Sequence, residues 1–344
     1  MHYARGAVVA CALAAAVLPV PAGWVERWYS RALYPRLQQA VSAVSALSPI
    51  ALFDVAIIVL AAMLLWSAVK WHRALGVAGM LRRVAVNLAV ISAVLYLWFL
   101  LFWGLNYRRV PLEHQLAYDS ARLTRDRAVE FARLAIDQAN ALKLEVGAPA
   151  SGDAPLASAL MEVRHWLGVP QSPRLGPSKR SLLELYFRKA AIDGMTDPFF
   201  LEVIVNPDVL PSERPFVLAH EWAHLAGYAD ESEANFVAWL TCIRASPAAR
   251  YSGWLSAYQH VASGLPAQDR RALAAALSSA VAADLAAERA RFARSSERVR
   301  VVARGAYDAY LRANRVSEGI ANYNAVVKLM LGASFDAEWR PVVR

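Results

Sequence analysis

Apolar residues dominate the first third of the chain and then give way to shorter, periodic patterns. Two uninterrupted apolar stretches, at 49–69 and 84–105, are each long enough to cross about 30 Å of hydrocarbon and predict transmembrane helices. A third stretch, at 6–25, is interrupted by prolines and is interpreted as a retained first span rather than a signal peptide. No comparable apolar run follows. Residues 1–105 are therefore predicted to be a membrane anchor, and 106–344 a separate domain.

The pattern in the second part of the chain is mostly helical. Apolar side chains recur at helical spacing over 124–143. Further helices are predicted at 156–167, 251–262, 267–291, 296–312 and 317–331. Residues 199–205 are rich in β-formers and predict a strand, and 182–192 is interpreted as a second strand. The predicted fold class is therefore α+β, mostly helical, with a small sheet behind the transmembrane helices.

Charge sets the expected orientation of the anchor. The segment between the second and third stretches carries Lys70, Arg73, Arg82 and Arg83 and no acidic residue, so the positive-inside rule predicts a cytoplasmic loop. The domain that follows is then extracytoplasmic. Residues 26–48, read as a loop, contain three arginines and argue weakly against this orientation.

The net charge of +9 does not indicate a nucleic-acid partner, because much of it borders the apolar stretches and no aromatic-basic recognition motif accompanies it. The expected partner is the lipid bilayer. Asp54, near the start of the second stretch, is interpreted as a solvated helix-start carboxylate rather than an intramembrane functional acid. Cys11 and Cys242 are not expected to pair.

One short motif carries chemistry. His220, Glu221 and His224 form the pattern H-E-x-x-H. On a helix, residues four apart lie one turn above each other, so the two imidazoles can hold one zinc ion. Glu221 lies roughly 100° around the axis, where it can take a proton from a water held by the metal and return it to a leaving amine. The motif therefore predicts a hydrolytic zinc site.

The surrounding residues support a helix at this place. The predicted strand at 199–205 is followed by a turn, and Ser212 is a suitable N-cap. Pro215 falls in the first turn, where its missing N–H costs little, and Gly227 is suited to a left-handed residue that ends the helix. The strand at 199–205 could also align a substrate backbone by β-addition, or serve as ordinary core.

The next helix must supply the third ligand, and three carboxylates compete for that role. Asp230 would complete a metzincin-like spacing, but Asp230 and Glu233 also form a D-x-x-E capping box. Glu231 is preferred because Asn235, one turn further on, can hydrogen-bond to a metal ligand. The expected order of preference is Glu231, Glu233, Asp230.

The motif with its E-x-x-A-N continuation, Glu231 to Asn235, resembles the gluzincin metallopeptidases, in which the first Glu of that string is the third zinc ligand. His220-Glu-Trp-Ala-His224, Gly227, Glu231-Ser-Glu-Ala-Asn-Phe236, Arg250-Tyr-Ser-Gly253, Trp103-Gly-Leu-Asn-Tyr107 and Tyr307-Asp-Ala-Tyr-Leu311 resemble the uncharacterised bacterial membrane family DUF3810. The resemblance spans nearly the whole chain. It implies a zincin-like domain held at the bacterial inner membrane by several spans.

Other candidates are weaker. Tyr251 and Arg250 could stabilise an oxyanion, although a buried tyrosine hydroxyl more often has a structural partner. His165 and His260 are interpreted as surface or helix histidines. Tyr307, Tyr310 and Tyr323 recur on one helical face and are interpreted as packing residues.

The leading hypothesis is a membrane-anchored zinc metallopeptidase that cleaves peptide bonds in envelope proteins or peptides. His220, His224 and Glu231 would bind Zn²⁺, and Glu221 would be the general base and acid. Two alternatives remain open at this point: a hydrolase of cell-wall peptides, and a non-catalytic envelope sensor or scaffold. The presence of Glu221 argues against the last, because a structural zinc site has no need of an adjacent base.

Overall fold

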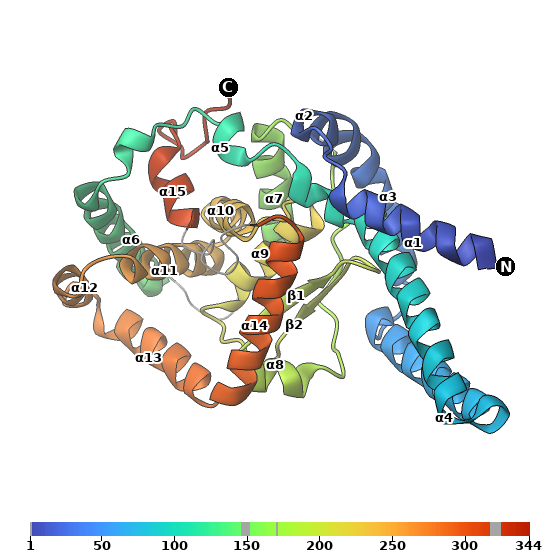
Figure 1. Cartoon of the computed structure of the whole chain (residues 1–344). Coiled ribbons are helices and arrows are strands. Elements are labelled where there is room, and N and C mark those ends of the chain that lie inside the picture. The colour runs from blue at the N-terminus through green and yellow to red at the C-terminus, as the bar shows by residue number, and fades with distance from the viewer. Residues whose placement is uncertain (1, 146–151, 170, 317–324) are drawn as a thin grey trace.

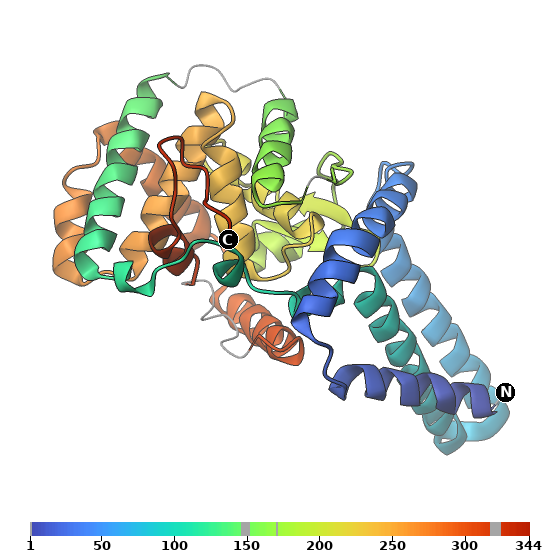
Figure 2. The ribbon, with the colours of Figure 1, turned by 90° about the horizontal axis from the view of Figure 1, so that it is seen from above.

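The computed structural model describes residues 2–145, 152–169, 171–316 and 325–344. The chain is mostly helical, with one small sheet, and an apolar helical arm projects from a helical body (Figure 1). The body is built from helices α5 to α15 and strands β1 and β2. The first helix runs along the arm, and the helices at 22–45 lie where the arm meets the body (Figure 2).

The N-terminal segment up to Ser45 is helical except at residues 18–21, which include Pro19 and Pro21. Helix α1 (His2–Val17) is followed by a bend of 108° and then by α2 (Ala22–Trp24), the π-helix η1 (Val25–Leu33) and α3 (Tyr34–Ser45). The predicted first span at 6–25 is therefore not one straight helix. The interpretation of 26–48 as a loop was wrong, because its buried side chains lie on one side of two helices that pack on the body.

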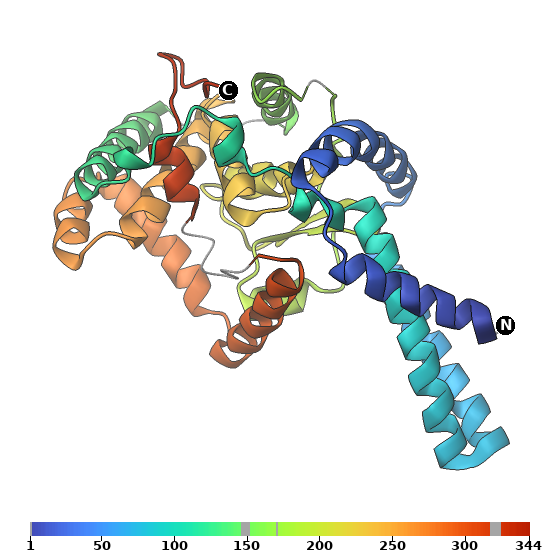
Figure 3. The same cartoon turned by 45° about the horizontal axis from the view of Figure 1, so that its top comes forward.

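The apolar arm is helix α4 (Leu52–Phe102), which contains both strongly apolar stretches predicted as spans. Its backbone breaks at Gly76, where φ is +68°, and the two halves lie side by side in Figures 1 and 3. The loop predicted between the stretches is helical on both sides of this glycine. An eighteen-residue window of α4 has a mean hydropathy of 2.4 and is only 6% buried, so this helix is long and apolar enough to cross a membrane.

Asp54, in the first turn of α4, is neither solvated nor free. Its carboxylate is 8% exposed and accepts hydrogen bonds from the Ser181 hydroxyl (2.8 Å) and the Leu182 amide (2.7 Å). The expectation of a solvated helix-start carboxylate was therefore wrong. Asp54 fixes the root of the arm to the segment that precedes α8.

The sheet has two antiparallel strands, β1 (Gly194–Asp197) and β2 (Glu202–Val205), and pairs Gly194 with Val205. The predicted strand at 199–205 thus begins later than expected, and β1 was not predicted at all. The strand expected at 182–192 is instead helix α8 (Glu184–Ala190), which ends at Ala191 with φ of +53°. Leu183, Phe187 and Ala190 face inward at helical spacing, a signal that the sequence contained.

Asp197 ends β1 and is fully buried. Its carboxylate accepts hydrogen bonds from the Phe199 and Phe200 amides at 3.0 and 2.8 Å, which shape the turn into β2. Burial raises the pKa of Asp197 from 3.8 to about 7, although these hydrogen bonds oppose the shift. The folded protein therefore holds a proton on Asp197 over a pH range in which the unfolded chain has lost it.

We expect this proton to make stability depend on pH. A carboxyl with a raised pKa in the folded state stabilises fully below its unfolded pKa, and the contribution is lost as pH rises through about 7. Asp197→Asn cannot ionise and keeps a side-chain oxygen for the turn. Wild-type stability relative to Asp197→Asn should therefore fall between pH 4 and 8, by at most about 4 kcal/mol. Thermal unfolding of both proteins in detergent checks this, and parallel pH profiles would contradict it.

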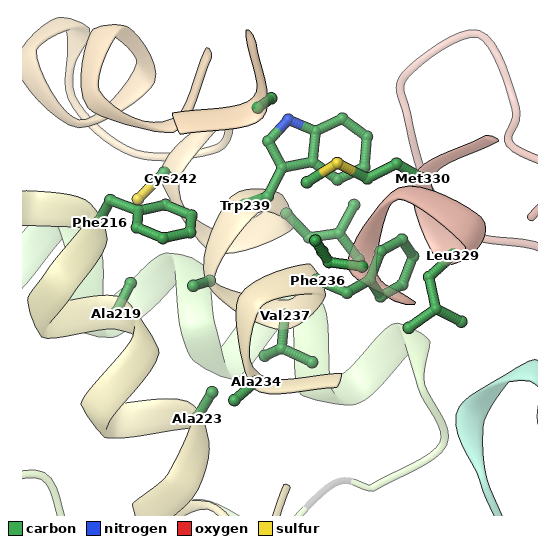
Figure 4. Packing of buried hydrophobic residues seen from close by; sticks show 14 of the residues in the cluster. Phe216, Ala219, Ala223, Ala234, Phe236, Val237, Trp239, Cys242, Leu329 and Met330 are labelled. Atoms are coloured by element: carbon green, nitrogen blue, oxygen red, sulfur yellow. The ribbon is translucent and has the colours of Figure 1, made fainter. Parts of the chain in front are cut away.

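The remaining helices surround a buried pair, α9 (Arg214–Leu225) and α10 (Glu231–Cys242). Every residue of α10 is buried, as expected for a helix enclosed on all sides. Ala223 of α9 lies next to Ala234 of α10, and Ala219 lies one turn earlier on α9; these small side chains let the two helices approach closely (Figure 4). The functional motif therefore lies on the most enclosed helices of the body.

The outer elements agree largely with the predicted helices. They are η2 (Gly104–Arg108), α5 (Leu112–Gln115), η3 (Ser120–Arg122), α6 (Arg125–Glu145), α7 (Ala154–Trp166), α11 (Pro247–Ser263), α12 (Ala267–Ala274), α13 (Ser279–Ala293), α14 (Glu297–Ala313) and α15 (Ala325–Gly332). The single helix predicted at 267–291 is two helices, because Ser278 caps α13 through the Val281 amide. Part of the helix predicted at 317–331 lies outside the described residues.

Candidate metal centre

Helix α9 carries the H-E-x-x-H residues. Glu213, not Ser212, occupies the N-cap position, and Pro215 lies in the first turn as predicted. The Ser212 hydroxyl instead donates to the Glu288 carboxylate at 3.2 Å. His220 and His224 therefore lie in the second half of a helix that begins with Arg214, with their side chains on one face.

The C-terminal end of α9 is held by side chains from four other parts of the chain. Gly227 has φ of +95°, as predicted for the residue that reverses the chain. Each of the last carbonyls accepts one side-chain hydrogen bond: His224 O from Trp103 (3.2 Å), Leu225 O from Tyr34 (2.9 Å), Ala226 O from Arg164 (2.6 Å) and Gly227 O from Arg109 (3.1 Å). Two of the donors are cations, which also favour the negative end of the helix dipole. The orientation of the metal-site helix is thus fixed from several directions.

The three competing carboxylates of α10 have different positions. Asp230 is the N-cap and accepts from the Ser232 and Glu233 amides, as the capping interpretation predicts. Glu233 does not complete the box: its carboxylate accepts from the Leu112 amide at 2.6 Å. Glu231 is the one that the fold brings to His220 and His224.

The donor atoms of these three residues converge. His220 Nε2 lies 3.1 Å from His224 Nε2 and 3.3 Å from Glu231 Oε2, and His224 Nε2 lies 3.5 Å from Glu231 Oε1. Donor atoms arranged tetrahedrally around zinc at about 2.0–2.1 Å lie about 3.3 Å from one another. Two imidazoles and one carboxylate at these separations fit a zinc ion with one open position.

Without a metal, the cluster favours a carboxylate at Glu231 but a protonated imidazole at His224. Although burial opposes the shift, Glu231 raises the pKa of His224 to about 9, so a zinc ion would have to displace this proton. His224 Nδ1 lies 2.8 Å from the Tyr228 carbonyl, so the ring donates there and Nε2 is directed to the cluster. Burial favours the neutral acid at Glu231. The charge of His224 and hydrogen bonds from both imidazoles nevertheless hold the pKa of Glu231 well below its usual 4.5. The carboxylate form, which binds metals, is therefore favoured.

Glu221 is held beside the cluster by strand β1. Its Oε2 lies 2.8 Å from the Thr196 hydroxyl, which also lies 2.8 Å from the Glu221 carbonyl. A Cβ on Gly194 would come within 2.6 Å of Glu221 Oε1, so any larger residue there would displace the Glu221 side chain from its position. Burial raises the pKa of Glu221, as suits a proton acceptor near neutral pH. Neither Thr196 nor Gly194 was predicted as a site residue.

Aromatic residues from two distant parts of the chain, the end of α4 and helix α14, lie near the cluster and line the cavity. Trp103 lies edge-on to His224, with ring centroids 6.1 Å apart, and Tyr107 packs edge-on to Trp103. The Tyr307 hydroxyl of α14 donates to Glu231 Oε1, and Tyr310 stacks on Tyr307. The interpretation of Tyr307 as a packing residue only was therefore wrong. The resemblance already pointed to these residues, since its first and last motifs contain them; Tyr323 lies outside the described residues.

The other candidates lie away from the cluster or lack the expected bond. Asn235 is buried and lines the same cavity, but its Nδ2 has no hydrogen-bond partner among the described residues. The Tyr251 hydroxyl donates to Asp284 at 2.6 Å, so it has the structural partner that was expected. Neither Tyr251 nor Arg250 lines the cavity. His260 packs near Phe216, and burial lowers its pKa to about 4.

The cluster opens into a cavity of about 1190 Å³. Its floor is α9, and its walls include β1, α8, α14 and the first turns of α4. Strand β1 borders the cavity, since Gly194, Met195 and Thr196 line it. Strand β2 pairs with β1 on one side and forms a bridge with Lys179 through Ile204 on the other. Of the two roles left open for 199–205, ordinary core therefore fits the structure, and the unpaired edge within the described sheet belongs to β1.

The comparisons with known proteins agree with the resemblance to one family. The family described as "Protein of unknown function (DUF3810)" matches residues 29–331. No curated protein and no solved structure matches the chain. The match runs from η1 to α15 and includes the arm, the sheet and the metal-site helices. The chain therefore belongs to the DUF3810 family.

Proposed function

We propose that this protein is a membrane-anchored, zinc-dependent peptidase of gluzincin-like design. The observation that carries the proposal is the convergence of His220, His224 and Glu231 at 3.1–3.5 Å beside a buried Glu221. This cluster lines a cavity large enough for a peptide. A purely structural metal site would favour a fourth protein ligand over a carboxylate and an open cavity.

Each residue has a distinct role in the proposed hydrolysis. His220, His224 and Glu231 would hold Zn²⁺, which supplies Lewis-acid polarisation of the peptide carbonyl when bound. Glu221 accepts a proton from the attacking water as the C–O bond forms, and returns it to the amine as the C–N bond breaks. Thr196 keeps the Glu221 carboxylate oriented. The Tyr307 hydroxyl reaches the same cluster from α14.

Strand β1 is suited to align the substrate. It borders the cavity through Gly194, Met195 and Thr196, and among the described residues its only strand partner is β2. A peptide that added to this free edge would run antiparallel or parallel to β1 and place a carbonyl near the cluster. The main-chain bonds would hold the peptide whatever its sequence, and cavity side chains would select among sequences.

We further propose that the protein crosses the bacterial inner membrane more than once, with its body on the extracytoplasmic side. Lys70, Arg73, Arg82 and Arg83 flank Gly76 at the tip of α4, far from the body (Figure 1). The positive-inside rule then assigns the tip to the cytoplasm. Of the three arginines at 26–48, Arg31 donates to Glu26, Gln115 and the Gly168 carbonyl and is thus held by the body.

The test of the proposal is loss of hydrolysis in Glu221→Gln without loss of metal. Full-length protein in proteoliposomes is incubated with a pool of quenched fluorescent peptides of randomised sequence. We expect zinc-dependent cleavage, lowered at least about 100-fold in Glu221→Gln because a general base contributes 10²–10⁴-fold. Glu130→Gln, an exposed carboxylate on α6, is the matched control. Absence of cleavage by zinc-loaded wild type, or equal rates in Glu221→Gln, would refute the proposal.

A further inference from the structure

The cavity extends from the metal cluster to the apolar arm. Phe53 and Ile57 of α4 line it together with His220 and Glu221. Ile57 lies more than one turn inside α4 and is 44% exposed, like Ile58 beside it at 54%. One wall of the cavity thus belongs to the helix whose exposed apolar side chains suit contact with lipid.

A rim of exposed apolar side chains borders the cavity next to this wall. Leu182, Leu185 and Tyr186 at α8 are 73%, 66% and 42% exposed, and Val301 and Val302 of α14 are 65% and 72% exposed. We call these five residues the apolar rim. Exposed apolar side chains that gather at one place on a protein surface are typical of an interaction site.

The rim is fixed at the level where the arm leaves the body. The Leu182 amide donates to Asp54 in the first turn of α4, and the Ser296 amide before α14 donates to the Lys189 carbonyl of α8 at 2.9 Å. Figures 1 and 3 show α8 and the start of α14 side by side, on the side of the body from which the arm projects. A bilayer crossed by α4 would therefore meet the rim.

Exposed cations flank the rim. Lys189 follows Leu185 and Tyr186 on α8, and Arg298 and Arg304 lie on either side of Val301 and Val302 on α14. Apolar side chains bordered by Lys and Arg are typical of helices that lie in the surface of a bilayer, with the cations at the headgroups. The charge pattern therefore favours lipid, rather than a soluble protein, as the surface that covers the rim.

We propose that the apolar rim lies in the bilayer surface and that the cavity opens sideways to the membrane, so that the substrate is a polypeptide anchored in the bilayer. The part of the inference that concerns the substrate rests on the proposed peptidase function, whereas the position of the rim in the bilayer does not depend on activity. An anchored chain would reach the cluster along Phe53 and Ile57, with its anchor still in lipid.

The position of the rim is tested by fluorescence quenching. Leu185→Cys and Val302→Cys are made in full-length Cys11→Ser protein, since Cys242 is buried, labelled with bimane and placed in nanodiscs of lipids brominated on their acyl chains. The matched control is Leu144→Cys, which is 88% exposed in the last turn of α6, a helix on the opposite side of the body from the arm (Figures 1 and 2). We expect at least about twofold quenching at both rim positions and none at the control. Equal signals at all three positions would overturn the proposal.

The substrate class is tested with the same randomised peptide pool in two forms, with and without a palmitoyl chain. We expect the acylated pool to be cleaved at least about tenfold faster, because the anchor raises its effective concentration at the cavity. Ile57→Trp narrows the cavity where it meets the arm, so it should lower the ratio of the cleavage rate of acylated peptides to that of free peptides. An effect of the anchor on local concentration alone would leave this ratio unchanged. Free peptides cleaved as fast as acylated ones would overturn the inference, whereas no cleavage of either pool would refute the peptidase itself.

Discussion

Glu231→Ala should reduce the zinc bound to the purified full-length protein from about one ion per chain to nearly none. Glu231 supplies one of three converging donors, and its two oxygens lie 3.3 and 3.5 Å from the histidine nitrogens. Loss of a supporting hydrogen bond around a metal ligand already costs about 10–100-fold in affinity, so loss of the ligand itself should cost at least about 100-fold. Elemental analysis after dialysis against trace zinc measures the difference.

The neighbouring acids provide matched controls for this experiment. Glu233→Ala removes an acceptor for the Leu112 amide, and Asp230→Ala removes the cap of α10. Both should lower stability, by about 1–3 kcal/mol for the buried acceptor and about 1 kcal/mol for the cap, yet keep the zinc. Zinc lost in Glu233→Ala but retained in Glu231→Ala would reverse the ligand assignment. A full-length chain is essential, because residues 22–45 share the core of the body.

The parts of the site that could be predicted from the sequence are those set by local spacing. His220 and His224 are one turn apart on α9. Asp230 is the N-cap of α10, and Glu231 and Glu233 both lie in the first turn of that helix. Such relations follow from helix geometry over a few residues. The choice of Glu231 over Glu233 could not follow from spacing alone, since Leu112, which binds Glu233, lies far away in the chain.

Long-range partners explain what the sequence could not reveal. Thr196 binds Glu221 from a strand of only four residues, too short for a clear alternating pattern. Trp103 lies at the end of an apolar helix and resembles a membrane-interface anchor, yet its ring nitrogen donates to the His224 carbonyl. In both cases the side chain has an ordinary local role, and only the fold shows its partner.

The errors in the fold have similar causes. Residues 26–48 lie between two apolar stretches and were interpreted as a loop, although Tyr29 and Tyr34 are buried in the core of the body. Asp54 was expected to be solvated because an acid at the start of an apolar helix usually faces water. Here the segment before α8 supplies two hydrogen bonds that replace water. Tertiary contacts overrode the local preference in each case.

A buried ion pair between Glu26 and Arg109 joins the N-terminal segment to the end of the metal-site helix. The Arg109 guanidinium donates to both oxygens of Glu26 at 2.9 Å, to the Gly227 carbonyl at 3.1 Å, and lies over the Tyr228 ring. Burial opposes ionisation of Glu26, but the charge of Arg109 holds its pKa below the usual 4.5. The pair therefore stays charged, and each member depends on the other.

Arg109→Ala should consequently destabilise the protein by about 3–5 kcal/mol, because it leaves Glu26 buried with only the partly exposed Arg31 as a partner. The Gly227 carbonyl also loses its donor, so the turn that places the Tyr228 carbonyl against His224 should loosen. We expect the melting temperature in detergent to fall by about 6–10 °C, whereas Arg127→Ala, which breaks an exposed pair with Glu130, should change it by less than about 1 °C.

A double variant separates two effects of Arg109→Ala: the loss of the hydrogen bond to the Gly227 carbonyl, and the burial of Glu26 without its partner charge. If the cost of Arg109→Ala comes mainly from unpaired Glu26, then adding Glu26→Gln should restore about 1–2 kcal/mol, since a neutral amide is far cheaper to bury than a carboxylate. Additive losses in the double variant would instead mean that the Gly227 and Tyr228 contacts carry the effect. In the first case the zinc content of the double variant should stay as low as in Arg109→Ala, because the Gly227 carbonyl still lacks its donor. Stability that recovers while zinc binding does not would show that the Arg109 guanidinium supports the metal centre through the turn at Gly227 and Tyr228, separately from its pairing with Glu26.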